Sequence, residues 1–187
     1  GRQWGVSITY KSQQSPNGIA EAFLIGEDFI GSSDVALILG DNIFFGDNPV
    51  FGLEDSFEGG ARVFAIETTT PERYGVVEYG QDGTVLSLEE KPQSPKSNYA
   101  VTGLYLLDSM AVSIAKYLEP SERGELEIVE LLGNYLSRGE LNVSRLSKNH
   151  KWFDAGNVET LLEASLEVKT LRSRGNDRFG DPWKANE

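Results

Sequence analysis

Two aspartates stand where a carboxylate can bind a metal ion or a phosphorylated substrate. Asp41 follows directly on an apolar run, in the motif LGDN, and Asp154 follows two aromatic residues in the motif WFDAG. Mg²⁺ prefers hard oxygen ligands, usually one or two carboxylates together with substrate phosphates and water. Each aspartate also has a purely structural interpretation. Asp41 fits the cap of a turn, and Asp154 fits the N-cap of a helix that begins near Asn157.

A lysine and a glutamate form a second candidate group, in the motif EEKP that ends a predicted strand. Lys91 can hold a phosphate as a point charge, and Glu90 can accept hydrogen bonds from sugar hydroxyls. The alternative is an exposed, charged strand end with no ligand.

Two further segments suit the approach of a ligand to the backbone. In the motif RYG, Tyr74 and Gly75 form either a turn or a segment along which a ligand lies. Gln13 and Gly18 bracket a predicted helix start, where free N–H groups favour anions. The sequence contains neither a Walker loop nor a GxGxxG motif after a strand.

Composition narrows the classes of function. The 187 residues carry a formal net charge of −12, which argues against binding of nucleic acid polymers. There is no cysteine, so disulfides and thiolate chemistry are excluded, and the single histidine, His150, disfavours a Ser-His-Asp triad. No apolar run is long enough to span a membrane. These features predict a cytoplasmic protein with small-molecule partners and no membrane association.

The elements that position the candidate residues are predicted from periodicity. Alternation predicts a strand over 6–11, and a continuous apolar run predicts a strand over 35–39 that is buried on both faces. A helix is expected from about residue 19 until Gly31. Further strands are expected at 61–67, 99–107, 141–146 and 152–153, an antiparallel hairpin at 76–88, and helices at 109–118, 125–136 and 158–171.

This order predicts an α/β fold: a mixed, mainly parallel, Rossmann-like sheet with flanking helices and an inserted antiparallel hairpin. Residues 1–172 form one domain in this prediction, and 173–187 a polar tail. Small molecules bind at the carboxyl ends of strands in such folds, which directs attention to Asp41, Lys91 and Asp154. A half-polar opening strand further predicts that a preceding strand and helix are missing.

Seven segments in the same order resemble the sugar nucleotidylyltransferases. They contain, in sequence letters, QQSPNGIA, LGDNIF, ERYGVVE, LEEKP, PKSNYAVTGLY, RGELEI and WFDAG. The resemblance covers about residues 1–172, and within that superfamily the chain is most similar to the glucose-1-phosphate thymidylyltransferases. It implies transfer of a thymidylyl group from dTTP to glucose 1-phosphate, giving dTDP-glucose and pyrophosphate, in dTDP-rhamnose biosynthesis. It also implies a homo-oligomer with Mg²⁺ as cofactor.

The resemblance assigns roles to individual residues. Asp41 and Asp154 would bind Mg²⁺, and Asp41 would lie beside the sugar nucleotide. Lys91 would bind the sugar phosphate, Glu90 the glucose hydroxyls, and Gly75 and Val101 the sugar through their backbones. The remaining members are Tyr74, beside the sugar pocket, and Gln13 and Gly18, which would contact the thymine and the nucleoside. Lys91, Asp41 and Asp154 are the predicted catalytic residues.

Departures from the family pattern leave alternatives open. The family's Gly-rich loop with its Arg and Lys is absent, so we expect little or no activity from the 187-residue chain alone. Glu21 replaces a Gln, and Val129 and Glu130 replace a Thr-Asp pair. The alternatives are a non-catalytic protein that binds sugar nucleotides, a structural fragment completed by another chain, and a transferase for another nucleotide or sugar.

Overall fold

The computed structural model describes residues 1–46 and 57–175. The helices are α1 (Glu21–Ile25), α2 (Glu27–Ile30), α3 (Met110–Ala115), α4 (Ile128–Ser137) and α5 (Val158–Ser173), with 3₁₀ turns at Arg2–Trp4 and Pro71–Arg73. The strands are β1 (Val35–Ile38), β2 (Asn42–Phe45), β3 (Ala61–Glu67), β4 (Gly75–Tyr79), β5 (Val85–Glu90), β6 (Tyr99–Leu107), β7 (Leu141–Arg145) and β8 (Lys151–Asp154). The described helices include none that is both long and apolar enough to cross a membrane.

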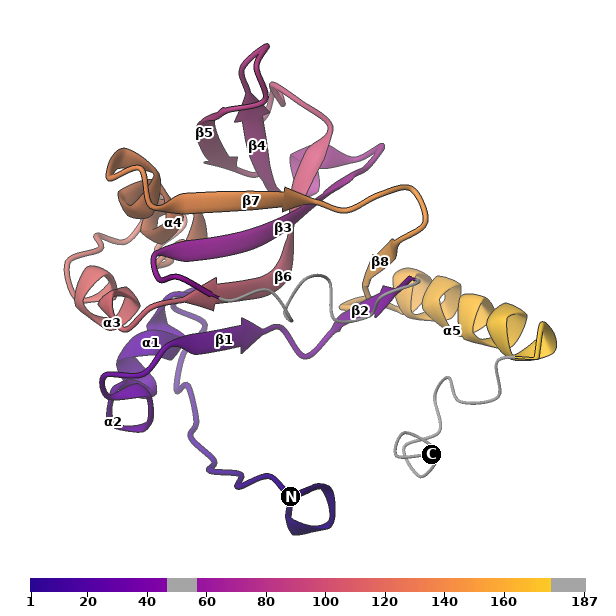
Figure 1. The fold of residues 1–187 in the computed structure, drawn as a ribbon, viewed down its shortest axis with the longest axis horizontal. Coiled ribbons are helices and arrows are strands. Elements are labelled where there is room, and N and C mark those ends of the chain that lie inside the picture. The colour runs from indigo at the N-terminus through magenta and orange to yellow at the C-terminus, as the bar shows by residue number, and fades with distance from the viewer. Residues whose placement is uncertain (47–56, 176–187) are drawn as a thin grey trace.

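The strands form two sheets of unequal size (Figure 1). The large sheet has the order β5-β4-β6-β3-β7, with β1 paired to the other part of β6, and the small sheet pairs β2 with β8. The mixed α/β class with flanking helices and the antiparallel β4–β5 hairpin are as predicted. The large sheet is mainly antiparallel and not mainly parallel as predicted, because β3–β7 is the one parallel pair among the described strands. The reason is that β6 runs antiparallel between β1 and β3, which share one direction.

The core lies between the large sheet and the helices α3 and α4. Val63, Leu107, Leu131 and Tyr135 are fully buried in it. The Tyr135 hydroxyl donates a hydrogen bond of 2.7 Å to Asp108, whose other carboxylate oxygen accepts one from the backbone N–H of Gly60 at 2.9 Å. This arrangement fixes α4 against the ends of β3 and β6.

Two predicted strands differ from the structure. Residues 6–11 form no strand, and Val6, Ile8 and Tyr10 are exposed. Alternation alone does not make a strand, since the described part of the chain offers these residues no hydrogen-bonded neighbour strand. β1 exists, but its burial alternates instead of covering both faces: Val35 and Leu37 pack against the core, whereas Ile38 is exposed.

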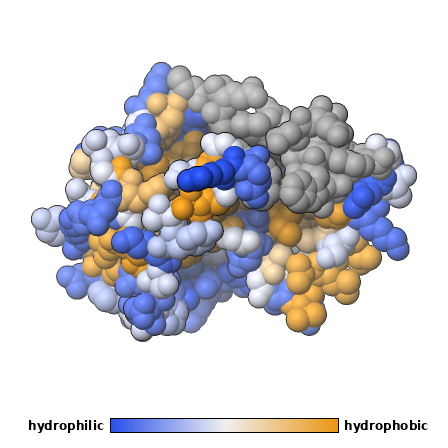
Figure 2. All heavy atoms as spheres, turned by 90° about the horizontal axis from the view of Figure 1, so that it is seen from below, coloured by the Kyte–Doolittle hydropathy of each residue, from blue (hydrophilic) through white to orange (hydrophobic). Residues whose placement is uncertain are grey.

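The last helix was predicted correctly in position, but four of its apolar residues face outward. Val158, Leu161, Leu162 and Leu166 are exposed on α5, and Ala164 is its buried residue. Figure 2 shows apolar side chains at the surface on the side of the molecule that carries α5. Of the predicted polar tail, residues 176–187 lie outside the described part of the chain.

Candidate functional site

The small sheet brings the two predicted aspartates together. β2 and β8 pair with Asn42 opposite Asp154, and the backbone N–H of Ala155 donates to the carbonyl oxygen of Asp41 at 2.8 Å. Both carboxylates converge on Gly156: a Cβ atom there would lie 2.9 Å from Oδ2 of Asp41 and 3.4 Å from Oδ1 of Asp154. Residues far apart in the sequence thus present two carboxylates at one point.

These aspartates line a cavity of about 240 Å³ between the small sheet and the large one. Every other residue of the predicted sugar and phosphate group lines the same cavity, namely Tyr74, Gly75, Glu90, Lys91 and Val101. The remaining lining residues are Ile19, Leu39, Asn42, Arg73, Gly103, Tyr105, Ile128, Val129 and Trp152. The cavity therefore joins an acidic end, with Asp41 and Asp154 beside β2 and β8, to Glu90 and Lys91 at the end of β5.

Lys91 is held by an unusual backbone conformation. Its φ of 43° lies in the left-handed region, which a residue with a side chain rarely adopts. Its backbone N–H donates to the carbonyl oxygen of Tyr74 at 3.0 Å, and its Nζ lies 3.8 Å from Oε1 of Glu90. Strained conformations of this kind cluster at functional sites, where surrounding contacts maintain them.

Glu90 stands in an environment that disfavours its charge. Burial, and secondly the negative charge of Glu127, raise the pKa of Glu90, against the opposing effect of Lys91 and Arg123. The Arg123 guanidinium lies 3.7 Å from Glu90 and 3.4 Å from the buried Glu127, whose carboxylate also accepts a hydrogen bond from Ser121. Glu90 is thus a partly desolvated acceptor for a polar ligand.

Aromatic side chains form one wall of the cavity. The rings of Tyr74 and Trp152 meet edge to face, with centroids 4.9 Å apart. Burial raises the pKa of Tyr74, and burial followed by the nearby charge of Glu90 raises that of Tyr105, so both phenols stay neutral near pH 7. A neutral aromatic wall of this kind suits the apolar face of a sugar ring.

The structure does not bring Gln13 and Gly18 into this cavity. Gln13 lines a separate hollow beside α1 and donates through its Nε2 to Glu21 at 2.6 Å and to the carbonyl of Gly18 at 3.1 Å. Gly18, with φ of 102°, packs on the backbone of Leu126, where a Cβ atom would lie 2.4 Å from the carbonyl oxygen. Their predicted contacts with the nucleoside stay predictions.

Sequence reasoning missed Asn42 and Tyr105 as cavity residues. Asn42 directly follows Asp41, but adjacency gives no sign that its side chain points into the cavity. Tyr105 does have a sequence signal, since it alternates along β6 with Val101 and Gly103, and alternate residues share one face of a strand.

The carboxylates suit a divalent cation whose coordination the substrate completes. Among residues 1–46 and 57–175, no group of three or more acidic, histidine or cysteine side chains could hold a metal by itself. Two convergent carboxylates fit Mg²⁺, which keeps water or phosphate oxygens in its other positions. The competing role for Asp154 as an N-cap falls to Asn157, whose Oδ1 accepts the N–H of Thr160 at 3.0 Å.

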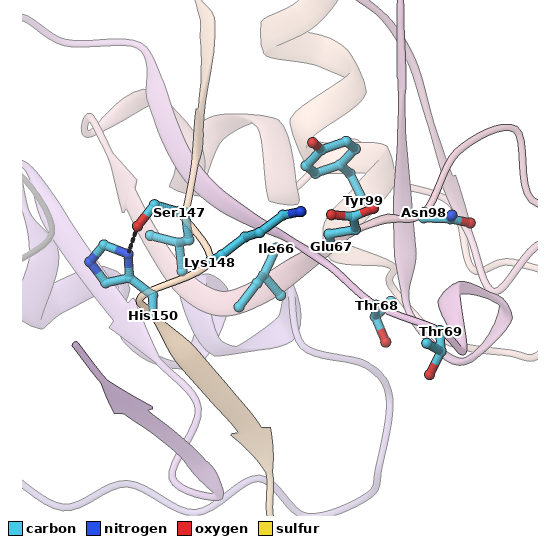
Figure 3. Close-up of a pocket in the computed structure, with 10 residues that line it drawn as sticks. Ile66, Glu67, Thr68, Thr69, Asn98, Tyr99, Ser147, Lys148 and His150 are labelled. Carbon is cyan, nitrogen blue, oxygen red and sulfur yellow. Dashed lines mark hydrogen bonds between the residues drawn. The ribbon is translucent and has the colours of Figure 1, made fainter.

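A larger hollow of about 770 Å³ lies at the carboxyl ends of β3 and β7 (Figure 3). Glu67, Thr69, Lys148 and His150 are among the residues around it, and Ser147 shares a hydrogen bond of 2.9 Å with His150. Its polar side chains are mostly exposed, and the acid and the lysine balance in charge. We place the candidate site in the smaller cavity, because there the carboxylates converge and the glutamate is desolvated.

The fold and the cavity define an α/β protein that can hold a polar ligand between a pair of carboxylates and a lysine. The chain belongs to the nucleotidyl transferase family, whose model matches residues 1–170. A glucose-1-phosphate thymidylyltransferase of Neisseria meningitidis is 48% identical over 178 residues, which are 94% of this chain and 62% of that protein. The chain thus spans about six-tenths of the length of this relative.

Two solved structures share the fold. One, from Bacillus anthracis in complex with a sucrose, is provisionally named a glucose-1-phosphate thymidylyltransferase; it has a TM-score of 0.78 and 42% identity, over 89% of this chain and 67% of that one. The other is a UDP-glucose pyrophosphorylase complexed with UDP-glucose, with a TM-score of 0.76 and 26% identity, over 87% of this chain and 66% of that one.

Proposed function

We propose that this protein serves the transfer of a thymidylyl group from dTTP to glucose 1-phosphate. In this reaction a phosphate oxygen of glucose 1-phosphate attacks the α-phosphorus of dTTP. The bond from that phosphorus to the bridging oxygen breaks, and dTDP-glucose and pyrophosphate are formed. The observation that carries the proposal is that Asp41 and Asp154 converge in the same cavity that Glu90 and Lys91 line.

In this proposal the residues act by positioning and by charge. Asp41 and Asp154 hold Mg²⁺, which when bound neutralises charge on the phosphate oxygens. Lys91 places its ammonium on the sugar phosphate, close to where negative charge develops. Glu90 accepts hydrogen bonds from the glucose hydroxyls. No covalent intermediate with the protein is needed, since bringing the two substrates together supplies much of the rate enhancement.

The remaining predicted residues bind the substrates. The backbones of Gly75 and Val101 line the sugar end, and Gly75 has no room for a side chain, because a Cβ atom would lie 2.8 Å from Val129 and 3.4 Å from Glu90. Tyr74 supplies the aromatic wall. Gln13 and Gly18 contact the thymine and the nucleoside in this proposal, on the side of the molecule where α1 begins.

Uridylyl transfer is the second candidate. It is favoured by the similarity to a UDP-glucose pyrophosphorylase complexed with UDP-glucose, at 26% identity. The higher identity of 48% to a thymidylyltransferase favours the thymine nucleotide. Binding of sugar nucleotides without catalysis is the non-enzymatic alternative, and the same cavity would serve it.

The proposal extends to the setting of the reaction. We propose a place in dTDP-rhamnose biosynthesis, because dTDP-glucose would be the product. We also propose a cytoplasmic location for this reaction. We propose a homo-oligomer on the basis of the resemblance to the family.

Titration calorimetry of the chain with dTDP-glucose, with and without Mg²⁺, tests the proposal. We expect binding that Mg²⁺ strengthens, and that both Lys91→Ala and Asp154→Ala weaken by about 10-fold or more, as loss of a charge-assisted contact does. Lys148→Ala is the matched control, since it removes a lysine from the larger hollow instead. UDP-glucose in the same titration measures the preference for thymine.

The outcomes separate the alternatives. No binding by a folded chain, or equal losses in the Lys91 and Lys148 variants, would contradict the proposed site. Binding of UDP-glucose tighter than that of dTDP-glucose would favour the uridylyl candidate.

A further inference from the structure

Asn42 is the point at which the small sheet is tied to the large one. Its Oδ1 accepts a hydrogen bond of 2.9 Å from the backbone N–H of Gly103 on β6 and one of 2.5 Å from Nε1 of Trp152 on β8. Its Nδ2 donates to Oδ1 of Asp41 at 2.9 Å. One amide group thus contacts the main chain of the large sheet, the aromatic wall and a carboxylate of the site.

The sequence around Asn42 is fitted to this contact. Gly103 has no space for a side chain, because a Cβ atom would lie 2.5 Å from Oδ1 of Asn42 and 2.8 Å from Cγ of Leu39. A larger residue at position 103 would push the amide away from its partners. Gly103 and Asn42 therefore form a matched pair across the two sheets.

The amide also gives the two carboxylate oxygens of Asp41 different surroundings. Oδ1 of Asp41 accepts from Asn42, whereas Oδ2 is the atom nearest to the space above Gly156 that Asp154 also faces. A hydrogen bond to one oxygen fixes the rotation of a carboxylate and so fixes the direction of the other. The chemistry of the amide matters here, since an acid at position 42 would keep the acceptor but lose this donor.

We propose that Asn42 is a positioning residue: it aims Oδ2 of Asp41 toward Asp154 for a divalent cation and holds Trp152 in place as the aromatic wall. The proposal rests on the proposed function for its ligand. Ligands of a metal are generally oriented by partners in an outer shell, and loss of such a partner typically costs about 10- to 100-fold in affinity. Asn42 is this partner for Asp41, and through Trp152 it couples the acidic end to the sugar end.

The test separates the donor from the acceptor of the amide. Asn42→Ala removes both, and Asn42→Asp keeps an oxygen for Trp152 and Gly103 but removes the donor to Asp41. Trp152→Phe replaces the indole by a smaller ring without the N–H. Asn142→Asp is the matched control, since it makes the same change at an exposed position of β7. For each variant we would measure dTDP-glucose binding with and without Mg²⁺, and the indole N–H resonances in ¹H–¹⁵N spectra without metal.

The deciding quantity is the strengthening factor, which is the ratio of the dTDP-glucose affinity with Mg²⁺ to the affinity without it. Asn42→Ala and Asn42→Asp should each reduce this factor by about 10-fold, whereas Asn142→Asp should leave it within about 2-fold of the wild-type value. The Trp152 resonance, assigned by its absence in Trp152→Phe, should move in Asn42→Ala and stay in Asn42→Asp. A purely structural residue would weaken binding equally with and without Mg²⁺.

A wild-type strengthening factor in Asn42→Asp, or a larger one, would overturn the proposal. So would an unmoved Trp152 resonance in a folded Asn42→Ala protein. If Asn42→Ala does not fold, Asn42→Asp alone decides, because it preserves the shape of the side chain. If the wild-type chain does not bind dTDP-glucose, the proposed function fails, and the Trp152 resonance still reports whether Asn42 holds the indole.

Discussion

The two walls of the cavity differ in how they are built. The wall with Glu90, Val101 and Tyr105 belongs to the large sheet, which a continuous core of buried side chains supports from α3 and α4. The wall with Asp41 and Asp154 belongs to the two-stranded sheet of β2 and β8, which lies beside α5 and its exposed apolar residues (Figure 1). A two-stranded sheet is marginally stable by itself.

This difference shows which contacts fix the positions of Asp41 and Asp154 at the acidic end. The geometry of the large-sheet wall is fixed by packing of the sheet against α3 and α4, whereas that of the small-sheet wall depends on a few specific contacts. These contacts are the Asn42 hydrogen bonds, the edge-to-face contact of Tyr74 with Trp152, and the Ala155 hydrogen bond to Asp41. Regions with few buried contacts open first, so we expect the acidic end to be the more easily disturbed.

The largest expected effect on stability comes from a pair of leucine substitutions, one on α4 behind the large sheet and one on α5 beside the small sheet. Leu131 on α4 is fully buried, and Leu162 on α5 is 58% exposed. Leu131→Ala should lower the free energy of unfolding by about 2–5 kcal/mol, through lost burial and the cavity left behind. Leu162→Ala should change it by less than about 0.5 kcal/mol. Urea unfolding followed by circular dichroism measures both, and similar losses would show that α5 is as tightly packed as α4.

A pair of glycine substitutions should change stability less. One of them lies where the two walls meet, at the contact of Gly103 with Asn42. Gly103→Ala should cost about 1–3 kcal/mol of stability, because the added methyl group meets Asn42 and Leu39 at overlapping distances. Gly133→Ala is the control, since its Cβ would meet no atom within 4 Å. That change, inside α4, should raise stability by about 0.5–1 kcal/mol, because alanine is the better helix former. Thermal unfolding of both variants checks the opposite signs, and a neutral Gly103→Ala would mean that the amide adjusts without cost.

Much of the large-sheet wall was predictable from the sequence. The hairpin, β6 and α4 follow local periodicity, and the apolar run before Asp41 correctly placed that residue shortly after the end of a strand. The pairing of β2 with β8 was not predictable, because it joins segments far apart and depends on tertiary contacts. A continuous apolar run also predicts burial on both faces, yet β1 packs only one face against the described core. Likewise, the alternation in 6–11 cannot reveal whether a partner strand is present.

The smallest effect concerns the charge of Glu90. Burial and the charge of Glu127 raise the pKa of Glu90 above the ordinary value of 4.5, so deprotonation costs the folded state more than the unfolded state. This cost is absent when both states are protonated, below the ordinary value, and it grows as pH rises through the folded pKa. Glu90→Gln should therefore gain stability relative to the wild type between pH 4 and pH 7.5, by about 1 kcal/mol or less. Glu89→Gln, at an exposed position next to it on β5, is the charge-matched control. Urea midpoints at the two pH values measure the difference; a gain that shrinks as pH rises would mean that Lys91 and Arg123 outweigh burial, and that Glu90 faces the cavity as a fully stabilised carboxylate.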